Sequence, residues 1–209
     1  MICVAEARRL YDSADAVHDF DHVLRVLKLA ERIARTEGAD LRIVRAAALL
    51  HDVDRHEAEA AGLDHAAVAA RRAREILSGH PSLLVGAVAD AIAAHRFRTA
   101  PEPGTLEAQV IYDADKLDAI GAVGVARAFA YGGAHGQRLW APIESVDFER
   151  WQAEGDDAAL HTPVHEFVVK LSHIKNHLHT EAGRGIAAER HDYMNAFFQR
   201  MAEEVGGTS

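Results

Sequence analysis

The segment from Leu41 to Val53 constrains the fold most, because it is almost continuously apolar and carries a histidine and an aspartate near its end. Arg42 and Arg45 stand where they can reach solvent, so we expect a helix that is buried on most sides. His51 and Asp52 close this helix. A carboxylate in apolar surroundings is costly unless it is paired or coordinated. The segment therefore predicts a helical core in which Asp52 has a partner, and a metal ion would supply one.

Further stretches repeat apolar residues at the spacing of a helix face. Alanine is abundant and the chain has 5 prolines, a balance that favours helices because alanine loses no side-chain entropy there. We expect helices over residues 19–35, 41–53, 64–77, 82–95, 106–131, 163–178 and 181–204. The predicted fold class is therefore all-α.

Capping residues and glycines define the ends and contacts of these helices. Asp64 is a suitable N-cap for the helix that follows it. Gly121 and Gly124 give the longest helix a small face for close packing. The doublet Gly132-Gly133 is expected to end that helix.

At 209 residues the chain is long enough for one sizeable core with a peripheral extension. We expect a single domain over residues 1–209, with a core over about 10–131. An irregular, lid-like segment follows over about 132–162. Helices over about 163–204 are expected to form a C-terminal hairpin packed on the helical bundle.

Composition and charge exclude several classes of protein. The formal net charge of -9 argues against a nucleic acid polymer as partner, since such binding depends on Lys and Arg that neutralise phosphates. No stretch approaches the roughly 20 apolar residues that span a bilayer, so we expect no membrane insertion. Cys3 is the single cysteine and the N-terminus carries no targeting pattern, which predicts a cytoplasmic protein.

Histidine is unusually frequent, with 14 residues, and imidazole serves in metal binding, proton transfer and phosphate contact. Several stand within expected helices, where solubility alone would not require them. We expect a surface position for His135, His161, His173, His177, His179 and His191. Among the aromatic residues we expect a core position for Phe129, Phe167, Phe197 and Phe198.

Residues of the metal-ligand type stand in three expected helices: His22 in HVLRV, the pair His51 and Asp52 in LLHDVD, and Asp115 in DADKLD. Imidazole and carboxylate together suit divalent cations such as Mn, Fe, Co, Zn or Mg, and the lack of a thiolate disfavours a structural zinc finger. Asp113 and Asp118 compete with Asp115 for the last position.

In this order the motifs resemble those of the HD-domain superfamily of metal-dependent phosphohydrolases. A subgroup of small single-domain bacterial HD proteins is similar over almost the whole chain, in the segments HDFDHVLRVLKLA, DADKLDAIGAVGVARAFAYGG and KLSHIKNHLHTEAGRGIAAERHDYMNAFF. The resemblance implies an all-α bundle with one divalent metal, manganese first and magnesium, iron, cobalt, nickel or zinc as alternatives. The implied ligands are His22, His51, Asp52 and Asp115.

For the subgroup the resemblance implies hydrolysis of a nucleoside triphosphate to a monophosphate and pyrophosphate. Related HD proteins cleave monophosphates, cyclic nucleotides and alarmones on the same scaffold, so a nucleoside monophosphate phosphatase and an alarmone hydrolase are alternatives. From other classes, a dinuclear-iron oxygenase and a non-catalytic nucleotide or metal sensor are alternatives. The expected partner is a small phosphorylated substrate, and the oligomeric state stays open, with a homodimer as one option.

Other residues are candidates for catalysis or substrate binding. Asp54 and His56 follow the His-Asp pair closely, and this closeness alone makes them candidates for the general base or the acid that protonates the leaving group. Side chains suited to contact phosphate are His18, Arg25, Lys116, Lys170 and Lys175. A solvated surface position is the competing interpretation for any single lysine. His65 and His95 are candidates for substrate contact, for support of a ligand, or for a second metal as in some HD proteins.

Overall fold

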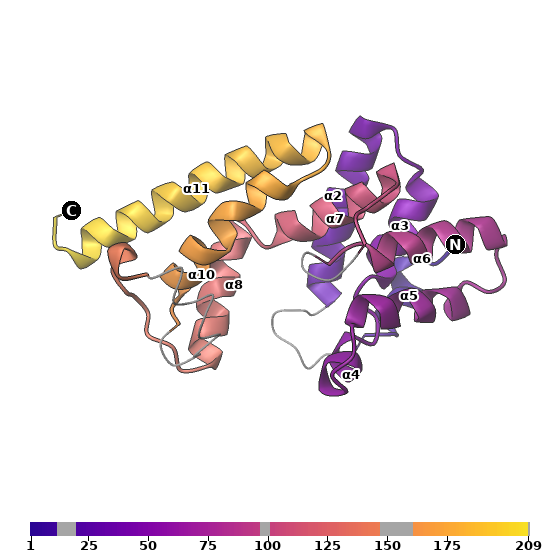
Figure 1. The fold of residues 1–209 in the computed structure, drawn as a ribbon, viewed down its shortest axis with the longest axis horizontal. Coiled ribbons are helices and arrows are strands. Elements are labelled where there is room, and N and C mark those ends of the chain that lie inside the picture. The colour runs from indigo at the N-terminus through magenta and orange to yellow at the C-terminus, as the bar shows by residue number, and fades with distance from the viewer. Residues whose placement is uncertain (12–19, 97–100, 147–160, 209) are drawn as a thin grey trace. The chain divides into compact units, whose positions relative to one another are not determined.

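The computed structural model describes residues 1–11, 20–96, 101–146 and 161–208 (Figure 1). Within these ranges every regular element is a helix, so the predicted all-α class is confirmed. None of the described helices is long and apolar enough to cross a membrane. The chain forms two compact units: the first comprises Met1–Lys116 and Leu178–Gly183, and the second comprises Leu117–His177 and Arg184–Ser209.

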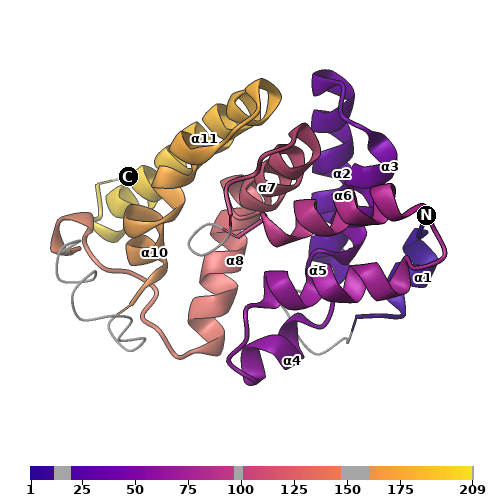
Figure 2. The same cartoon turned by 45° about the vertical axis from the view of Figure 1, so that its right-hand side comes forward.

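Several helices of the first unit pack around α3. The elements are α1 (Val4–Arg8), α2 (Phe20–Glu37), α3 (Leu41–Leu50), α4 (Arg55–Ala60), α5 (His65–Ile76), α6 (Ser82–Ala93) and α7 (Leu106–Asp118), whose last two residues belong to the second unit. Helix α3 contacts α2, α5 and α6, and α5 and α6 lie side by side (Figure 2). The helices predicted over 19–35, 64–77 and 82–95 correspond to α2, α5 and α6.

Helix α3 is buried on nearly every side, as its sequence predicts. Ala46, Ala47 and Ala48 are at most 1% exposed, and such small side chains let neighbouring helices approach closely. Asp40 caps the helix by accepting a hydrogen bond from the backbone N–H of Arg42. The prediction that this helix runs over residues 41–53 is wrong at its end, because the helix stops at Leu50 and the His-Asp pair follows it in a turn.

The prediction of one helix over residues 106–131 is wrong, because the structure contains two helices there, α7 and α8 (Gly121–Ala134). Gly121 has a φ of +79°, a left-handed conformation that favours glycine. A Cβ on Gly124 would lie 2.2 Å from the carbonyl oxygen of Ala119. The two glycines therefore permit the break between the helices, which differs from the packing face that the sequence suggests. Helix α8 also continues through the glycine doublet that was expected to end it.

The second unit contains α8, η1 (Ile143–Ser145), α10 (Pro163–Val169), η2 (Leu171–His177) and most of α11 (Glu181–Val205). The helix predicted over 163–178 is divided into α10 and η2, whereas the helix predicted over 181–204 matches α11. The lid-like segment predicted over about 132–162 begins inside α8, and its residues 147–160 lie outside the described ranges.

Aromatic rings from three helices pack together in the second unit. Phe167 of α10 and Phe198 of α11 are buried and stack with their ring centroids 4.3 Å apart. Phe129 of α8 and Phe197 of α11 are half-buried and meet edge to face at 6.0 Å. The predicted core position is therefore confirmed for the first pair, and the second pair borders that core.

Two of the histidines expected at the surface are buried, so the prediction is wrong for His161 and His191. Nε2 of His161 lies 3.3 Å from Oε2 of Glu166, a partner that lets the ring be buried. His191 is buried because it shares a face of α11 with the buried residues Ala187 and Met194. The expected exposed position is confirmed for His135, His173 and His177.

The buried carboxylate of Asp113 joins α7 to the segment before α11. It accepts hydrogen bonds from the backbone N–H groups of His179 and Thr180, at 2.9 and 2.8 Å, and from the Thr180 hydroxyl at 2.6 Å. Gly183 is required beside it, because a Cβ there would lie 2.5 Å from Asp113 Oδ2. His179 is half-buried against the ring of Tyr112 and so departs from its expected surface position.

Glu166 holds two partners in the second unit. Its Oε2 faces His161, and its Oε1 accepts a hydrogen bond from Lys170 Nζ at 2.7 Å. Burial raises the pKa of Glu166, but the hydrogen bonds and charges of these partners outweigh burial and lower the pKa from 4.5 to about 2. Lys170, a candidate phosphate contact, is therefore engaged in an ion pair.

Glu166→Gln should destabilise the protein by about 1–2 kcal/mol at neutral pH, because it removes a paired carboxylate that is only partly exposed. The folded-state pKa lies below the ordinary value of 4.5, so this contribution is present above that pH and is lost as the pH falls toward about 2. Urea unfolding of both proteins from neutral to acidic pH measures the difference. Glu204→Gln is the control, since its pair with Arg200 is exposed, and equal effects of the two changes at every pH would contradict the prediction.

Candidate metal centre

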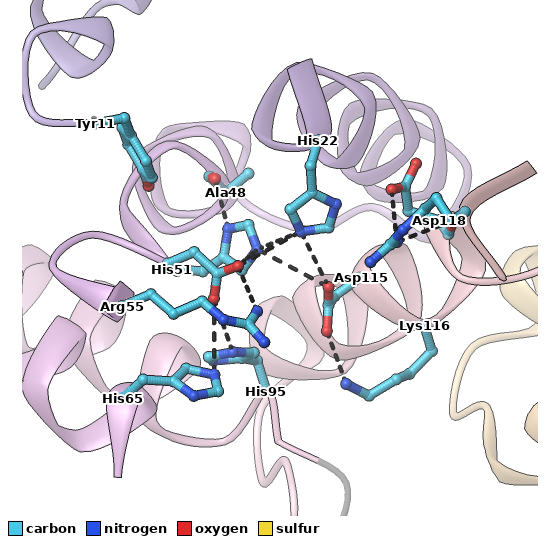
Figure 3. Close-up of polar contacts among 12 residues, drawn as sticks. Tyr11, His22, Ala48, His51, Arg55, His65, His95, Asp115, Lys116 and Asp118 are labelled. Atoms are coloured by element: carbon cyan, nitrogen blue, oxygen red, sulfur yellow. Dashed lines mark hydrogen bonds and ion pairs between the residues drawn. The ribbon is translucent and has the colours of Figure 1, made fainter. Parts of the chain in front are cut away.

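Side chains from three parts of the first unit meet in one buried cluster (Figure 3). His22 comes from the first turn of α2, His51 and Asp52 follow the end of α3, and Asp115 comes from α7. His22 and His51 are at most 1% exposed, and Asp52 is 4% exposed. The structure therefore brings together all four residues that the sequence predicts as metal ligands.

The spacing of the ligand atoms tests whether one cation fits among them. Nε2 of His22 lies 3.3 Å from Nε2 of His51, 3.6 Å from Asp52 Oδ2 and 3.5 Å from Asp115 Oδ1. Nε2 of His51 lies 3.7 and 3.9 Å from the same two oxygens. Such nitrogen-to-oxygen distances are too long for hydrogen bonds. Ligand atoms about 2.1 Å from one cation are separated by roughly 3.0–3.6 Å at ordinary coordination angles. His22, His51 and Asp52 come close to this spacing and form a group that could hold a metal ion, and Asp115 Oδ1 lies beside that group.

Helix ends orient two of the imidazole rings. Nδ1 of His51 donates to the carbonyl oxygen of Ala48 at 2.9 Å, and Nδ1 of His95 donates to that of Ile92 at 2.6 Å. A carbonyl only accepts, so in each neutral ring the proton is on Nδ1 and Nε2 presents its lone pair to the cluster. Burial first, and then the neighbouring His51, lowers the pKa of His95 to about 3, so the ring is neutral at physiological pH.

Asp52 Oδ1 faces a second pair of imidazoles. It lies 3.7 Å from Nε2 of His65 and 3.7 Å from Nε2 of His95. This oxygen is buried and has no hydrogen-bond partner in the described part of the chain, although a buried carboxylate oxygen is costly to leave unsatisfied. Asp52, His65 and His95 therefore form a second group that could hold a cation, next to the group of His22, His51 and Asp52.

Each ligand carboxylate is also paired with a cationic side chain. Arg55 Nη1 donates to Asp52 Oδ2 at 2.8 Å, and Lys116 Nζ donates to Asp115 Oδ2 at 2.7 Å. Burial raises the pKa of Asp52, but the charges of His51 and Arg55 outweigh it and leave the pKa below its ordinary value. Burial also raises the pKa of Asp115, but the charges of Lys116 and His51 outweigh it and lower the pKa well below its ordinary value. Both carboxylates are therefore ionised at neutral pH, as metal ligands must be.

Two residues that support the cluster are not evident from the sequence. Arg55 begins α4 and pairs with Asp52, and Tyr11 donates its hydroxyl to the carbonyl oxygen of Leu49 at 2.9 Å. Burial raises the pKa of Tyr11 well above its ordinary value, so the hydroxyl remains a donor. Arg55 stands next to the His-Asp turn and could have been found by its position, whereas no local pattern places Tyr11 at the end of α3.

The predicted catalytic residues Asp54 and His56 lie in and after the same turn. Asp54 has a φ of 56°, the left-handed conformation, and its Oδ2 lies 3.3 Å from Nε of Arg72. Burial raises the pKa of Asp54. His56 is exposed on α4. The catalytic roles of both residues stay predictions.

The remaining candidates divide by location. His65, His95 and Lys116 belong to the cluster, and Arg25 is half-buried on α2. Lys175 is exposed on η2 of the second unit, and His18 lies outside the described residues. The competitors of Asp115 have other partners, since Asp113 binds Thr180 and Asp118 Oδ2 accepts from Arg127 Nη1 at 3.1 Å.

Known proteins share the sequence pattern that contains these residues. The HD domain family model matches residues 19–120. The uncharacterized protein YpgQ of Bacillus subtilis is 33% identical over 194 residues, which cover 91% of this chain and 85% of YpgQ. The chain belongs to the HD domain family.

Solved structures of HD proteins extend the similarity to the three-dimensional level. The crystal structure of B. subtilis YpgQ in complex with ADP has a TM-score of 0.72 and 30% identity, covering 99% of this chain and 100% of that one. A predicted HD superfamily hydrolase from an uncultured Thermotogales bacterium has a TM-score of 0.64 and 30% identity, with 96% and 88% of the two chains covered. An HD-superfamily hydrolase from Bacillus thuringiensis has a TM-score of 0.73 and 28% identity, with 97% and 94% covered. This HD protein is thus related to hydrolases, and its His/Asp clusters are of the kind that holds a divalent metal.

Adding Mn²⁺ to the metal-free HD protein should raise Tm by about 5–10 °C, because an ion at one hundred times its Kd contributes about 2.7 kcal/mol to a domain of this size. Asp52→Asn should remove most of this rise, since Asp52 belongs to both ligand groups. Asp54→Asn, in the same turn, is the control and should retain it. Thermal unfolding with and without the ion measures both, and a full rise in Asp52→Asn would show that the ion binds elsewhere.

Proposed function

We propose that this HD protein is a metal-dependent phosphohydrolase that converts nucleoside triphosphates to monophosphates and pyrophosphate. The observation that carries the proposal is the buried cluster, in which Asp52 lies between two pairs of imidazoles. The YpgQ relative whose structure contains ADP supports a nucleotide as the substrate class.

The charges of the cluster favour an anionic substrate although the chain as a whole is acidic. Asp52 and Asp115 contribute two negative charges, and Arg55 and Lys116 offset them. His95 is neutral at physiological pH because its pKa is about 3. A divalent cation would therefore leave the site with a net positive charge, which attracts phosphate locally whatever the net charge of the surface.

His22, His51, Asp52 and Asp115 would hold the cation, with manganese as the first choice and magnesium, iron, cobalt, nickel or zinc as alternatives. A bound divalent cation supplies charge stabilisation at phosphoryl oxygens and lowers the pKa of water. Asp52, His65 and His95 offer a place for a second ion. The side chains of the protein orient these groups, and His22, His51 and Asp52 are shielded from bulk water because they are at most 4% exposed.

Other residues would contact the substrate. Lys116 is 17% exposed and lies beside Asp115, so it can reach a phosphate at the mouth of the cluster. Arg25 of the first unit remains a candidate for the outer phosphates. Lys170 and Lys175 belong to the second unit, and their role in phosphate contact stays a prediction. Asp54 or His56 would act in proton transfer.

Product analysis tests the proposed reaction. Purified protein with Mn²⁺ and a panel of nucleoside triphosphates should release pyrophosphate and monophosphate in equal amounts, and Asp52→Asn should lower the rate at least 100-fold because both ligand groups lose a charge. Release of inorganic phosphate from monophosphates would instead indicate a phosphatase, and release of pyrophosphate from alarmones an alarmone hydrolase. Oxygen consumption with bound iron would identify an oxygenase, and nucleotide binding without turnover a sensor.

Asp54→Ala and His56→Ala test the proton-transfer roles. If either residue is the general base or acid, its loss should lower kcat by about 100-fold or more at neutral pH. The pH dependence of kcat should also lose one limb in that variant. Full turnover in both variants would exclude these roles and leave the proposed reaction standing.

A further inference from the structure

Arg55 reaches into the metal-ligand cluster from the first position of α4. Figure 3 shows its guanidinium among the ligand side chains. Nη1 donates to Asp52 Oδ2 at 2.8 Å, and Nε donates to Glu59 Oε1 at 2.9 Å, so the side chain is held at two points. It is 24% exposed, whereas Asp52 is 3% exposed at its side chain. The guanidinium is therefore more exposed to solvent than the carboxylate that it binds.

Arg55 and Lys116 differ in which carboxylate oxygen they bind, the one that faces the imidazoles or the other one. Lys116 binds Asp115 Oδ2, while Oδ1 of the same carboxylate faces the imidazoles. Arg55 binds Asp52 Oδ2, which is the oxygen that faces Nε2 of His22 and His51 at 3.6 and 3.7 Å. A metal ion in this group and the Arg55 guanidinium would thus share one oxygen, and their like charges would repel each other at close range.

We infer that Arg55 is a substrate-binding residue that gives up Asp52 and takes a phosphoryl group when the metal and a nucleoside polyphosphate bind. This inference rests on the proposed function, since it names the group that recognises the phosphate of that substrate. The planar fork of a guanidinium matches two phosphoryl oxygens, and it has five N–H donors. Glu59 keeps hold of Nε, so the side chain remains at the site while its Nη groups change partner.

If Arg55 exchanges Asp52 for phosphate in this way, its removal should change the affinity for metal and the affinity for phosphate in opposite directions. Without Arg55, the metal should bind more tightly, because Asp52 Oδ2 loses a competing donor and the site loses a like charge. The phosphate should bind more weakly, because a charge-assisted pair is gone. A residue that merely held Asp52 in place would have the opposite effect on the metal, which would then bind more weakly when the residue is removed.

Arg55→Met and Arg55→Gln test the inference by titration calorimetry, with Mn²⁺ as one probe and ADP at saturating Mn²⁺ as the other. Both variants should bind Mn²⁺ about 3-fold to 10-fold more tightly and ADP about 10-fold to 100-fold more weakly than the unchanged protein. Arg55→Lys keeps the charge but not the fork, so it should retain the Mn²⁺ affinity and recover only part of the ADP affinity. Circular dichroism confirms folding of each variant.

Arg72→Met is the matched control. Arg72 pairs with Asp54 of the same turn and with Glu75, is 42% exposed, and should change neither affinity. Weaker Mn²⁺ binding by both Arg55 variants, or unchanged ADP binding, would overturn the inference. Neither titration needs turnover, so failure of the unchanged protein to hydrolyse any triphosphate would refute the proposed function and leave this inference to be judged by the two affinities.

Discussion

Burial of the Asp52 carboxylate is the constraint on which the rest of the structure depends. The charge stands at the end of an apolar helix, where its desolvation must be balanced by partners inside the protein. One oxygen faces His22 and His51, and the other faces His65 and His95. These rings come from the starts or ends of α2, α3, α5 and α6. The ends of four helices of the first unit therefore meet around one carboxylate, which accepts a hydrogen bond from Arg55.

Helix termini supply much of the precision at this centre. The last carbonyl groups of a helix lack partners within it, and at α3 and α6 imidazole rings provide donors to Ala48 and Ile92. The same rings then present their other nitrogen to the cluster. Tyr11 satisfies a further carbonyl at the end of α3. One hydrogen bond from each imidazole thus satisfies a carbonyl at the end of the helix and also fixes the orientation of the ring.

Local patterns predicted the parts of the fold that are decided locally. The buried α3 follows from its apolar run, and α5 begins after Asp64 because that residue caps it. The order of the ligand motifs also predicted which residues meet. The break before Gly121 was not predictable, since the apolar periodicity continues across it and a glycine with positive φ looks in sequence like a packing glycine. The Tyr11 contact spans 38 positions and carries no local signal.

The hydrogen bonds between Asp113 and Thr180 connect positions that are 67 residues apart. The stretch that matches the HD domain family, residues 19–120, includes every imidazole and carboxylate of the cluster. Asp113 lies two residues before Asp115, and its hydrogen-bond donors at His179 and Thr180 lie outside this stretch. Without these donors, burial would favour protonation of the Asp113 carboxyl or displacement of the helix. During synthesis, the segment around Thr180 emerges from the ribosome after all the ligands, so the hydrogen bonds that hold Asp113 can form only then.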